Sequence, residues 1–288
     1  MAPKTVPPTA RQRRLGRELR RLREQTDMTA TEAGAFLGAS QGRMSNIETG
    51  RYAVSADRVR TLAHHYRCTD QGLIEALAGM TGGRTRGWWE EYREVLPHQM
   101  LDIAELEYHA AGFRIAANFY VPGLLQTAQY ARAVFAAYVP SFPPHEVEHR
   151  VSHRLKRQAV LYGEKPTPLT AILHEAALHM EVGGPAVMYE QLEYLIEMSE
   201  RGDVTLLLTP FGAGALPNSG QPFDYLEGAV TQLDTVLLDT DHGSEIIDAE
   251  AKLATYRAIW DRMASGALGP ESSRRSIRRI AQGLKERT

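Results

Sequence analysis

The residues whose types and spacing can do chemistry gather in the short stretch QGRMSN at residues 41–46. Gln41 and Asn46 carry amides that can form paired hydrogen bonds with adenine, and Arg43 can bind guanine or a phosphate. Gly42 lies on the same side and is small, so we group it with them as a candidate base-reading residue. Side chains suited to the sugar–phosphate backbone lie beside them, and these are Ser40, Ser45, Arg51 and Tyr52. The stretch therefore predicts a surface that reads DNA.

Two short helices joined by a tight turn must position these side chains. The residues expected to cap or end the two helices are Thr29, Leu37, Gly38, Ser40 and Gly50. Met44 and Ile47 are three residues apart, so both face the core and leave the polar side chains on the opposite side. This is the pattern of a helix-turn-helix whose second helix enters the major groove.

The charge is divided unevenly along the chain, although the net charge of the 288 residues is only −2. Residues 1–87 hold 15 Lys and Arg against 8 Asp and Glu, a net of +7, and the remaining residues hold 18 against 27, a net of −9. A basic part is the electrostatic pattern of nucleic-acid binding, whereas DNA repels an acidic one. We therefore expect only the N-terminal part to touch DNA.

The cysteine content and the lack of long apolar segments indicate the cellular compartment. Cys68 is the single cysteine, which excludes an intramolecular disulfide and fits a reducing cytoplasm. The start, MAPKTVPPTARQRR, has no apolar signal core, and no run approaches the roughly 18 apolar residues of a membrane span. We expect a cytoplasmic protein that does not contact a membrane.

Composition also predicts the domain organisation. Residues 1–9 are proline-rich and expected to be disordered. Residues 10–80 are expected to form a helix-turn-helix module of five helices, and the glycine-rich residues 81–87 a flexible linker. The rest, residues 88–288, is expected to be a regulatory and dimerisation domain.

This second domain changes character along its length. Residues 88–162 predict helices alone, at 88–95, 101–111, 124–138 and 146–162. Residues 163–288 alternate short β-branched or aromatic runs with helical ones, with strands expected at 170–173, 204–209, 223–227 and 235–239 and helices at 186–201, 249–264 and 272–285. The predicted fold class is an all-α five-helix helix-turn-helix module followed by a mixed, helix-rich α/β domain.

The segment GASQGRMSNIETGR at 38–51 resembles the recognition segment of the Xre and phage Cro/repressor family. The matching positions are Met28, Thr29, Leu37, Gly38, Ser40, Met44, Ser45, Ile47, Glu48 and Gly50. By that resemblance Gln41, Gly42 and Asn46 occupy the positions that usually read bases. The chain departs from the family pattern at Ala30, Ala33 and Phe36, where the family has a phosphate-binding Gln, a core Leu and a solvated polar residue.

The second domain is similar to the C-terminal domain of the actinobacterial WhiJ-like, antitoxin-like regulators. Six ordered motifs carry the similarity, and these are WWEEYREVLP (88–97), VPGLLQTAQYARAV (121–134), HRLKRQAVL (153–161), HEAALHMEVGGPAVMYEQLEYLIE (174–197), DVTLLLTPFGAGA (203–215) and FDYLEG (223–228). The resemblance implies a small acidic partner protein, and it supplies no catalytic residues.

Three other patterns in the sequence could indicate a catalytic, metal or ligand site. Residues 38–42 satisfy G-x-S-x-G, but a nucleophile elbow needs a strand before it, and here a helix is expected. His145, His149 and His153 share one helix face, yet the third lies too far along the axis to complete a zinc site. Loop residues 211–215 and 217–220 are candidate walls of a small-ligand pocket.

We therefore predict a DNA-binding transcriptional regulator whose C-terminal domain dimerises and receives a signal from a ligand or a partner protein. Its expected partners are double-stranded operator DNA, a second copy of the chain and a small acidic protein. No catalytic residue, metal or cofactor is expected. Two alternatives remain open: an antitoxin-like binder of the small partner, and a hydrolase with an attached DNA-binding module.

Overall fold

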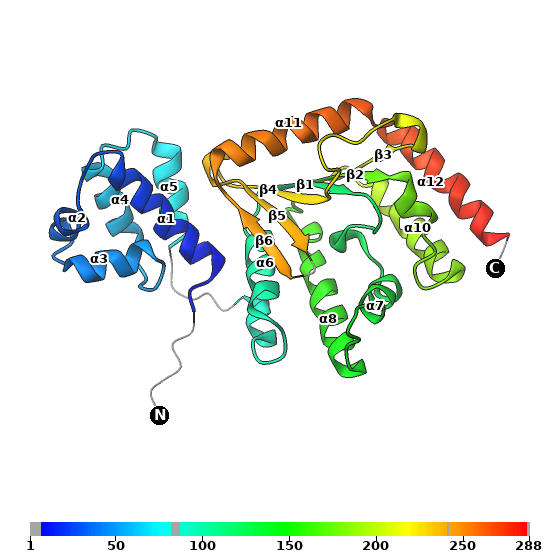
Figure 1. Ribbon diagram of the computed structural model, residues 1–288, viewed down its shortest axis with the longest axis horizontal. Coiled ribbons are helices and arrows are strands. Elements are labelled where there is room, and N and C mark those ends of the chain that lie inside the picture. The colour runs from blue at the N-terminus through cyan, green and yellow to red at the C-terminus, as the bar shows by residue number, and fades with distance from the viewer. Residues whose placement is uncertain (1–6, 82–86, 241, 287–288) are drawn as a thin grey trace. The chain divides into compact units, whose positions relative to one another are not determined.

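The computed structural model describes residues 7–81, 87–240 and 242–286. Its contacts divide the chain into two compact units, Met1–Glu90 and Glu91–Thr288 (Figure 1). Residues 1–6 of the start predicted to be disordered, and residues 82–86 of the predicted linker, lie outside the described residues. None of the described helices combines the length and the apolar character needed to cross a lipid bilayer.

The described part of the N-terminal unit contains five α-helices. They are α1 (Ala10–Glu24), α2 (Ala30–Phe36), α3 (Gln41–Glu48), α4 (Ala56–His65) and α5 (Gln71–Gly79). Each begins after a residue whose side chain accepts a hydrogen bond from the first turn, as helix N-caps do, and these residues are Thr9, Thr29, Ser40, Ser55 and Asp70. The predicted caps Thr29 and Ser40 are confirmed.

Two glycines allow α1 to lie directly against the end of α3. A Cβ on Gly16 of α1 would come within 2.4 Å of the carbonyl oxygen of Glu48. Gly50, which follows α3, has a φ of +75°, and a Cβ there would lie 2.8 Å from the backbone of Gln12. Because only a residue without a side chain permits these approaches, the direction of α3 is tied to that of α1.

The C-terminal unit is built on a mixed sheet that has six strands within the described residues. They are β1 (Gly112–Ala117), β2 (Leu169–His174), β3 (Val204–Thr209), β4 (Phe223–Glu227), β5 (Thr235–Thr240) and β6 (Gly243–Ile247). Their order in the sheet is β3-β2-β1-β4-β5-β6. β1, β2 and β3 run parallel, and β4, β5 and β6 are joined antiparallel. The predicted fold class is confirmed.

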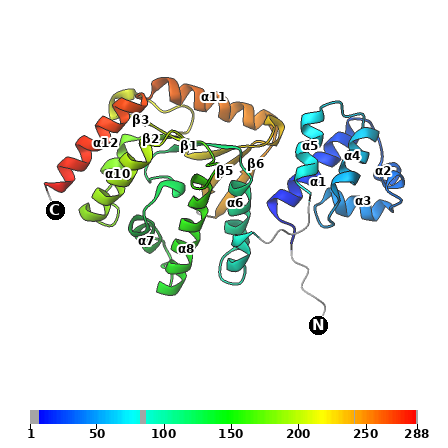
Figure 2. The same ribbon diagram turned by 180° about the vertical axis from the view of Figure 1, so that it is seen from behind.

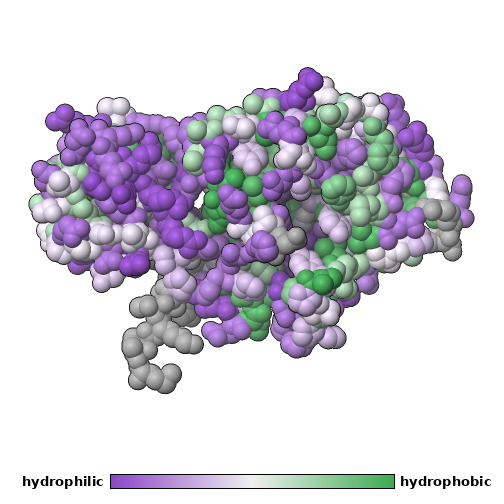
Figure 3. Space-filling view, viewed as in Figure 1, coloured by the Kyte–Doolittle hydropathy of each residue, from purple (hydrophilic) through white to green (hydrophobic). Residues whose placement is uncertain are grey.

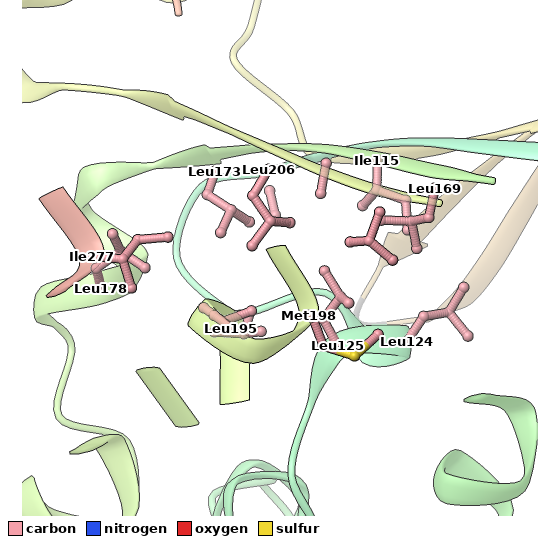
Figure 4. Packing of buried hydrophobic residues seen from close by; sticks show 14 of the residues in the cluster. Ile115, Leu124, Leu125, Leu169, Leu173, Leu178, Leu195, Met198, Leu206 and Ile277 are labelled. Atoms are coloured by element: carbon pink, nitrogen blue, oxygen red, sulfur yellow. The ribbon is translucent and has the colours of Figure 1, made fainter. Parts of the chain in front are cut away.

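Helices cover both faces of this sheet (Figures 1 and 2). They are α6 (His98–Tyr108), α7 (Ala128–Ala136), α8 (Pro144–Arg157), α9 (Glu175–His179), α10 (Pro185–Ser199), α11 (Glu250–Gly266) and α12 (Pro270–Lys285). On one face Ile115, Leu169 and Leu206 pack with Leu195 and Met198 of α10 in the larger core cluster, as Figure 4 shows. The opposite face packs against α11, through a cluster that includes Phe223, Tyr225, Val236, Leu253 and Trp260.

The expectation that residues 88–162 form helices alone needs correction. Residues 112–117 form β1, which lies between β2 and β4 near the middle of the sheet. Its sequence, GFRIAA, is largely buried on both faces, so it lacks the alternation of apolar and polar residues that marks a half-exposed strand. The short edge strand β6 was also missed.

Several helix boundaries differ from the prediction. The segment expected as one helix at 124–138 is a 3₁₀ turn at Gly123–Leu125 followed by α7. The segment expected as a helix at 88–95 is a 3₁₀ helix at Trp88–Tyr92. In both segments the first residues form a 3₁₀ helix where an α-helix was expected.

The close contact of α1 with α3 predicts opposite outcomes for two glycine substitutions. Gly16→Ala forces its new methyl group into the backbone of α3, and we expect it to lower the free energy of unfolding by about 1–3 kcal/mol. Gly42→Ala, at an open position of α3 with nothing within 4 Å, should raise it by up to about 1 kcal/mol through helix propensity. Urea unfolding followed by circular dichroism measures both. Equal effects of the two substitutions would contradict this packing.

Candidate nucleic-acid interface

Helix α3 presents the predicted base-reading residues to solvent. Gln41, Gly42 and Arg43 are exposed and Asn46 is partly exposed. The opposite side of the helix is buried, with Met44 and Ile47 only 0% and 3% exposed. The division between an outward polar side and an inward apolar side is the one predicted from the sequence.

Three of the four predicted phosphate-contacting residues flank the same helix, with Ser40 before it and Arg51 and Tyr52 after it. Ser40 caps α3, with its hydroxyl accepting a hydrogen bond from the Arg43 amide at 3.3 Å. At the other end the Asn46 carbonyl accepts hydrogen bonds from the amides of Arg51 and Tyr52, at 2.9 and 3.1 Å. The side chains of Arg51 and Tyr52 are exposed. Ser45 is partly exposed on the helix itself.

Arg43 and Arg51 differ from several other arginines of this unit because they have no acidic partner within the described residues. Some exposed arginines elsewhere in the unit are neutralised by acidic neighbours, as in the pairs Arg20–Glu24 at 2.7 Å and Arg60–Glu75 at 2.8 Å. Within the described residues, no hydrogen bond or ion pair engages the side chain of Arg43 or Arg51. Their charges are therefore available to an external anion, and the surface of this unit seen in Figure 3 is mostly hydrophilic.

A buried ion pair fixes the inner side of α3. Arg23 of α1 donates to both carboxylate oxygens of Glu48, from Nε at 2.6 Å and from Nη2 at 3.0 Å. Its third nitrogen donates to the Met28 carbonyl at 2.6 Å, just before α2 begins. The hydrogen bonds to Glu48 raise the pKa of Arg23. One guanidinium thus holds α1, α3 and the start of α2 together.

Two arginines of α1 that position this unit, Arg11 and Arg23, were not predicted from the sequence. Arg23 gave no signal among seven arginines of one helix, and only its partner Glu48, which matches the family pattern, pointed to a role. Arg11 donates to the carbonyls of Gly79 and Met80, at 3.0 and 2.7 Å, and so satisfies the exposed end of α5. The exposed Phe36 stacks on His65 with ring centroids 3.6 Å apart.

The other candidate sites acquire structural roles. The G-x-S-x-G segment follows helix α2 rather than a strand, and Ser40 is a helix cap. The rings of His145 and His149 lie 6.4 Å apart while His153 is buried, and burial lowers the pKa of His153 to about 3. Among the residues that the structure describes, no group of three or more acidic, Cys or His side chains is arranged to hold a metal ion.

One of the two predicted ligand loops lines a pocket in the C-terminal unit. Residues 217–220 form one wall of a shallow pocket of about 300 Å³, opposite Lys252, Tyr256 and Ile259 of α11. The loop 211–215 does not line it. Glu245 and Lys252 face each other across the rim at 4.0 Å, so the polar groups of this pocket are partly satisfied by each other.

Comparison with protein families agrees with this architecture. A family model described as "Helix-turn-helix domain" matches residues 14–77, so the N-terminal unit is a helix-turn-helix domain of the DNA-binding type. A model described as "Domain of unknown function (DUF5753)" matches residues 100–279, more than half of the chain, and the protein belongs to this family. Comparison with curated proteins and with solved structures gave no match.

The Arg23–Glu48 pair predicts a large stability loss when either partner is removed. Arg23→Ala or Glu48→Ala leaves one buried charge without compensation, and we expect a cost of about 3–5 kcal/mol in the free energy of unfolding. Glu75→Ala, which breaks the exposed pair with Arg60, should cost less than about 1 kcal/mol and serves as the control. Chemical denaturation distinguishes the two, and a loss at Glu48 no greater than at Glu75 would contradict the role of the pair.

Proposed function

We propose that the protein is a sequence-specific DNA-binding transcriptional regulator of the Xre type. The observation that carries this proposal is the outward side of α3, where polar and basic side chains lack partners within the described residues while the inward side is buried and held by Glu48. A helix of this kind fits the major groove of B-DNA, which is about 12 Å wide.

Each side chain has a definite role in this proposal. Gln41, Gly42, Arg43 and Asn46 face the base edges, since they lie on the exposed side of the helix. The residues that contact phosphates are Ser40, Ser45, Arg51 and Tyr52. The hydroxyls and the guanidinium of this second set fix the register of α3 on the duplex without reading its sequence.

We propose that the C-terminal unit dimerises and receives a signal. A single short recognition helix reads only a few base pairs, so regulators of this kind bind two half-sites as dimers. The net charge of −9 over residues 88–288 disfavours DNA contact there and leaves this unit for other partners. The WhiJ-like resemblance supports a small acidic protein as one such partner, and with it the antitoxin-like alternative. The DNA target and the single cysteine support a cytoplasmic location.

A hydrolase function is the less favoured proposal. Its best sequence candidate, Ser40, points its hydroxyl at the amide of Arg43, and no His or acidic side chain is hydrogen-bonded to it among the described residues. A nucleophile needs a base within hydrogen-bond reach. We therefore propose a regulator without catalytic activity, and turnover abolished by one His or Asp substitution in the C-terminal unit would overturn that proposal.

The two sets of residues on α3 predict two different binding defects. Asn46→Ala or Gln41→Ala should cost about 1–3 kcal/mol on the specific operator and much less on random DNA. Arg51→Ala should weaken binding to all sequences and lower the salt dependence, the slope of log K against log salt, by about one unit. Fluorescence anisotropy at several salt concentrations measures both.

The matched control for these variants is Arg60→Ala, which removes an exposed arginine that the fold already pairs with Glu75. It should leave both the affinity and the salt slope unchanged. Equal losses on operator and random DNA for Asn46→Ala would show that this side chain does not read bases.

A further inference from the structure

One part of the second core cluster of the C-terminal unit opens into a pocket. This cluster lies between α11 and the sheet, and α11 crosses that face in both views of the fold (Figures 1 and 2). Leu238 and Ile247 of the cluster, together with Tyr256 and Ile259 of α11, line the pocket of about 300 Å³ that residues 217–220 border. The pocket therefore has an apolar floor that is continuous with the core.

The loop at residues 217–220 is a wall that the fold itself holds in place. The Gly220 amide donates to the Pro217 carbonyl at 3.1 Å, which closes a tight turn. Asn218 and Gly220 have positive φ angles, of +51° and +65°. Asn118, a buried residue after β1 that does not line the pocket, donates its side-chain amide to the Gly220 carbonyl. A wall fixed in this way needs little ordering when a ligand binds, which favours affinity.

The rim of the pocket carries neutral hydrogen-bonding groups that the fold does not use. They are the side chains of Asn218, Ser219 and Gln221 and the hydroxyl of Tyr256, none of which is hydrogen-bonded to another described residue. Burial and the nearby Glu245 raise the pKa of Tyr256, so its phenol is protonated at neutral pH and can both donate and accept. These groups can supply donors and acceptors to a ligand that lies on the apolar floor.

The charges of the rim compensate each other. Glu245 and Lys252 are the two charged residues among the described ones that line the pocket, and their side chains are 4.0 Å apart and exposed. A charged ligand would have to compete with this pair, and an exposed ion pair contributes little in return for the lost hydration of the ligand. An uncharged ligand leaves the pair intact, so the pocket favours a neutral molecule.

The volume and the aromatic lining narrow the class of ligand further. An apolar cavity of about 150 Å³ holds one benzene molecule, so a pocket of about 300 Å³ accommodates one ring with a short substituent. Tyr256 already packs on Phe223, with ring centres 5.0 Å apart and an interplanar angle of 61°. An aromatic ligand against Tyr256 would extend this arrangement, and aromatic pairs bind more strongly than their contact area alone accounts for.

We propose that this pocket binds a small, uncharged aromatic molecule, one substituted ring whose polar group exchanges hydrogen bonds with Tyr256 and the loop. The ring lies on Leu238, Ile247 and Ile259, and the substituent faces the rim. The inference rests on the sensing role proposed for the C-terminal unit, and it gives that role a site and a class of ligand.

Saturation-transfer difference NMR on the full chain tests the inference with benzamide, a ring that carries one carboxamide. Three molecules of nearly the same size serve as comparators: benzoate is anionic, benzylamine is cationic, and cyclohexanecarboxamide is not aromatic. Benzamide should show saturable binding with transfer to its ring protons. Each comparator should bind at least about threefold more weakly, because it loses the aromatic contact or must desolvate a charge.

Variants of Tyr256 locate the binding. Tyr256→Phe removes only the hydroxyl, and the Kd for benzamide should rise about fivefold. Tyr256→Leu also removes the ring, and the Kd should rise more than about tenfold. Tyr108→Leu, at an exposed tyrosine of α6 outside the lining, is the matched control and should leave the Kd unchanged. Circular dichroism checks the fold, and Tyr256→Phe keeps the packing on Phe223, so it tests the site even where Tyr256→Leu unfolds.

Three results would overturn the inference. They are the absence of transfer to benzamide up to its solubility limit, binding of any comparator as tightly as benzamide, and a Kd that the Tyr256 variants leave unchanged. Operator binding by the same chain keeps the two proposals distinct. Operator binding without benzamide binding would reject the pocket alone, and benzamide binding without operator binding would reject the proposed DNA-binding function alone.

Discussion

The buried pair between Arg23 and Glu48 is the interaction on which the N-terminal unit depends. Two parallel hydrogen bonds set the angle as well as the distance between α1 and α3, and a third bond from the same guanidinium reaches the Met28 carbonyl before α2. A buried ion pair adds little stability over well-packed apolar side chains. Its contribution is geometric, since it holds the inner side of α3 so that Gln41 and Asn46 face outwards.

Both units contain arginines that are paired with acidic side chains. Several arginines that serve the fold are neutralised by an acidic side chain, as in Arg60–Glu75 and Arg157–Glu107. Where an arginine is available to a partner, the fold leaves it without such a neighbour, as with Arg43 and Arg51 on the surface. The arginines without an acidic neighbour on and beside α3 are therefore the ones best placed to meet the phosphates and bases of DNA.

Local chemistry made much of the fold predictable. The caps Thr29 and Ser40, the buried Met44 and Ile47 and four of the strands follow from side chains a few residues apart. The failures involve distant partners. Strand β1 is recognisable only through β2 and β4, which pair with it from 50 or more positions further along. The Arg23–Glu48 pair spans 25 residues, and the Glu107–Arg157 pair spans 50. No pattern among neighbouring residues of the sequence predicts such contacts.

Hydroxyl-radical footprinting of the full chain on the DNA upstream of its own coding sequence tests the central claim most directly. A dimer that inserts one α3 into each of two major-groove half-sites should protect two short segments whose centres lie about one helical turn apart, or a multiple of it. Sequence-specific protection with this spacing is the expected result. Protection that is uniform along the fragment, or absent at physiological salt, would contradict the account.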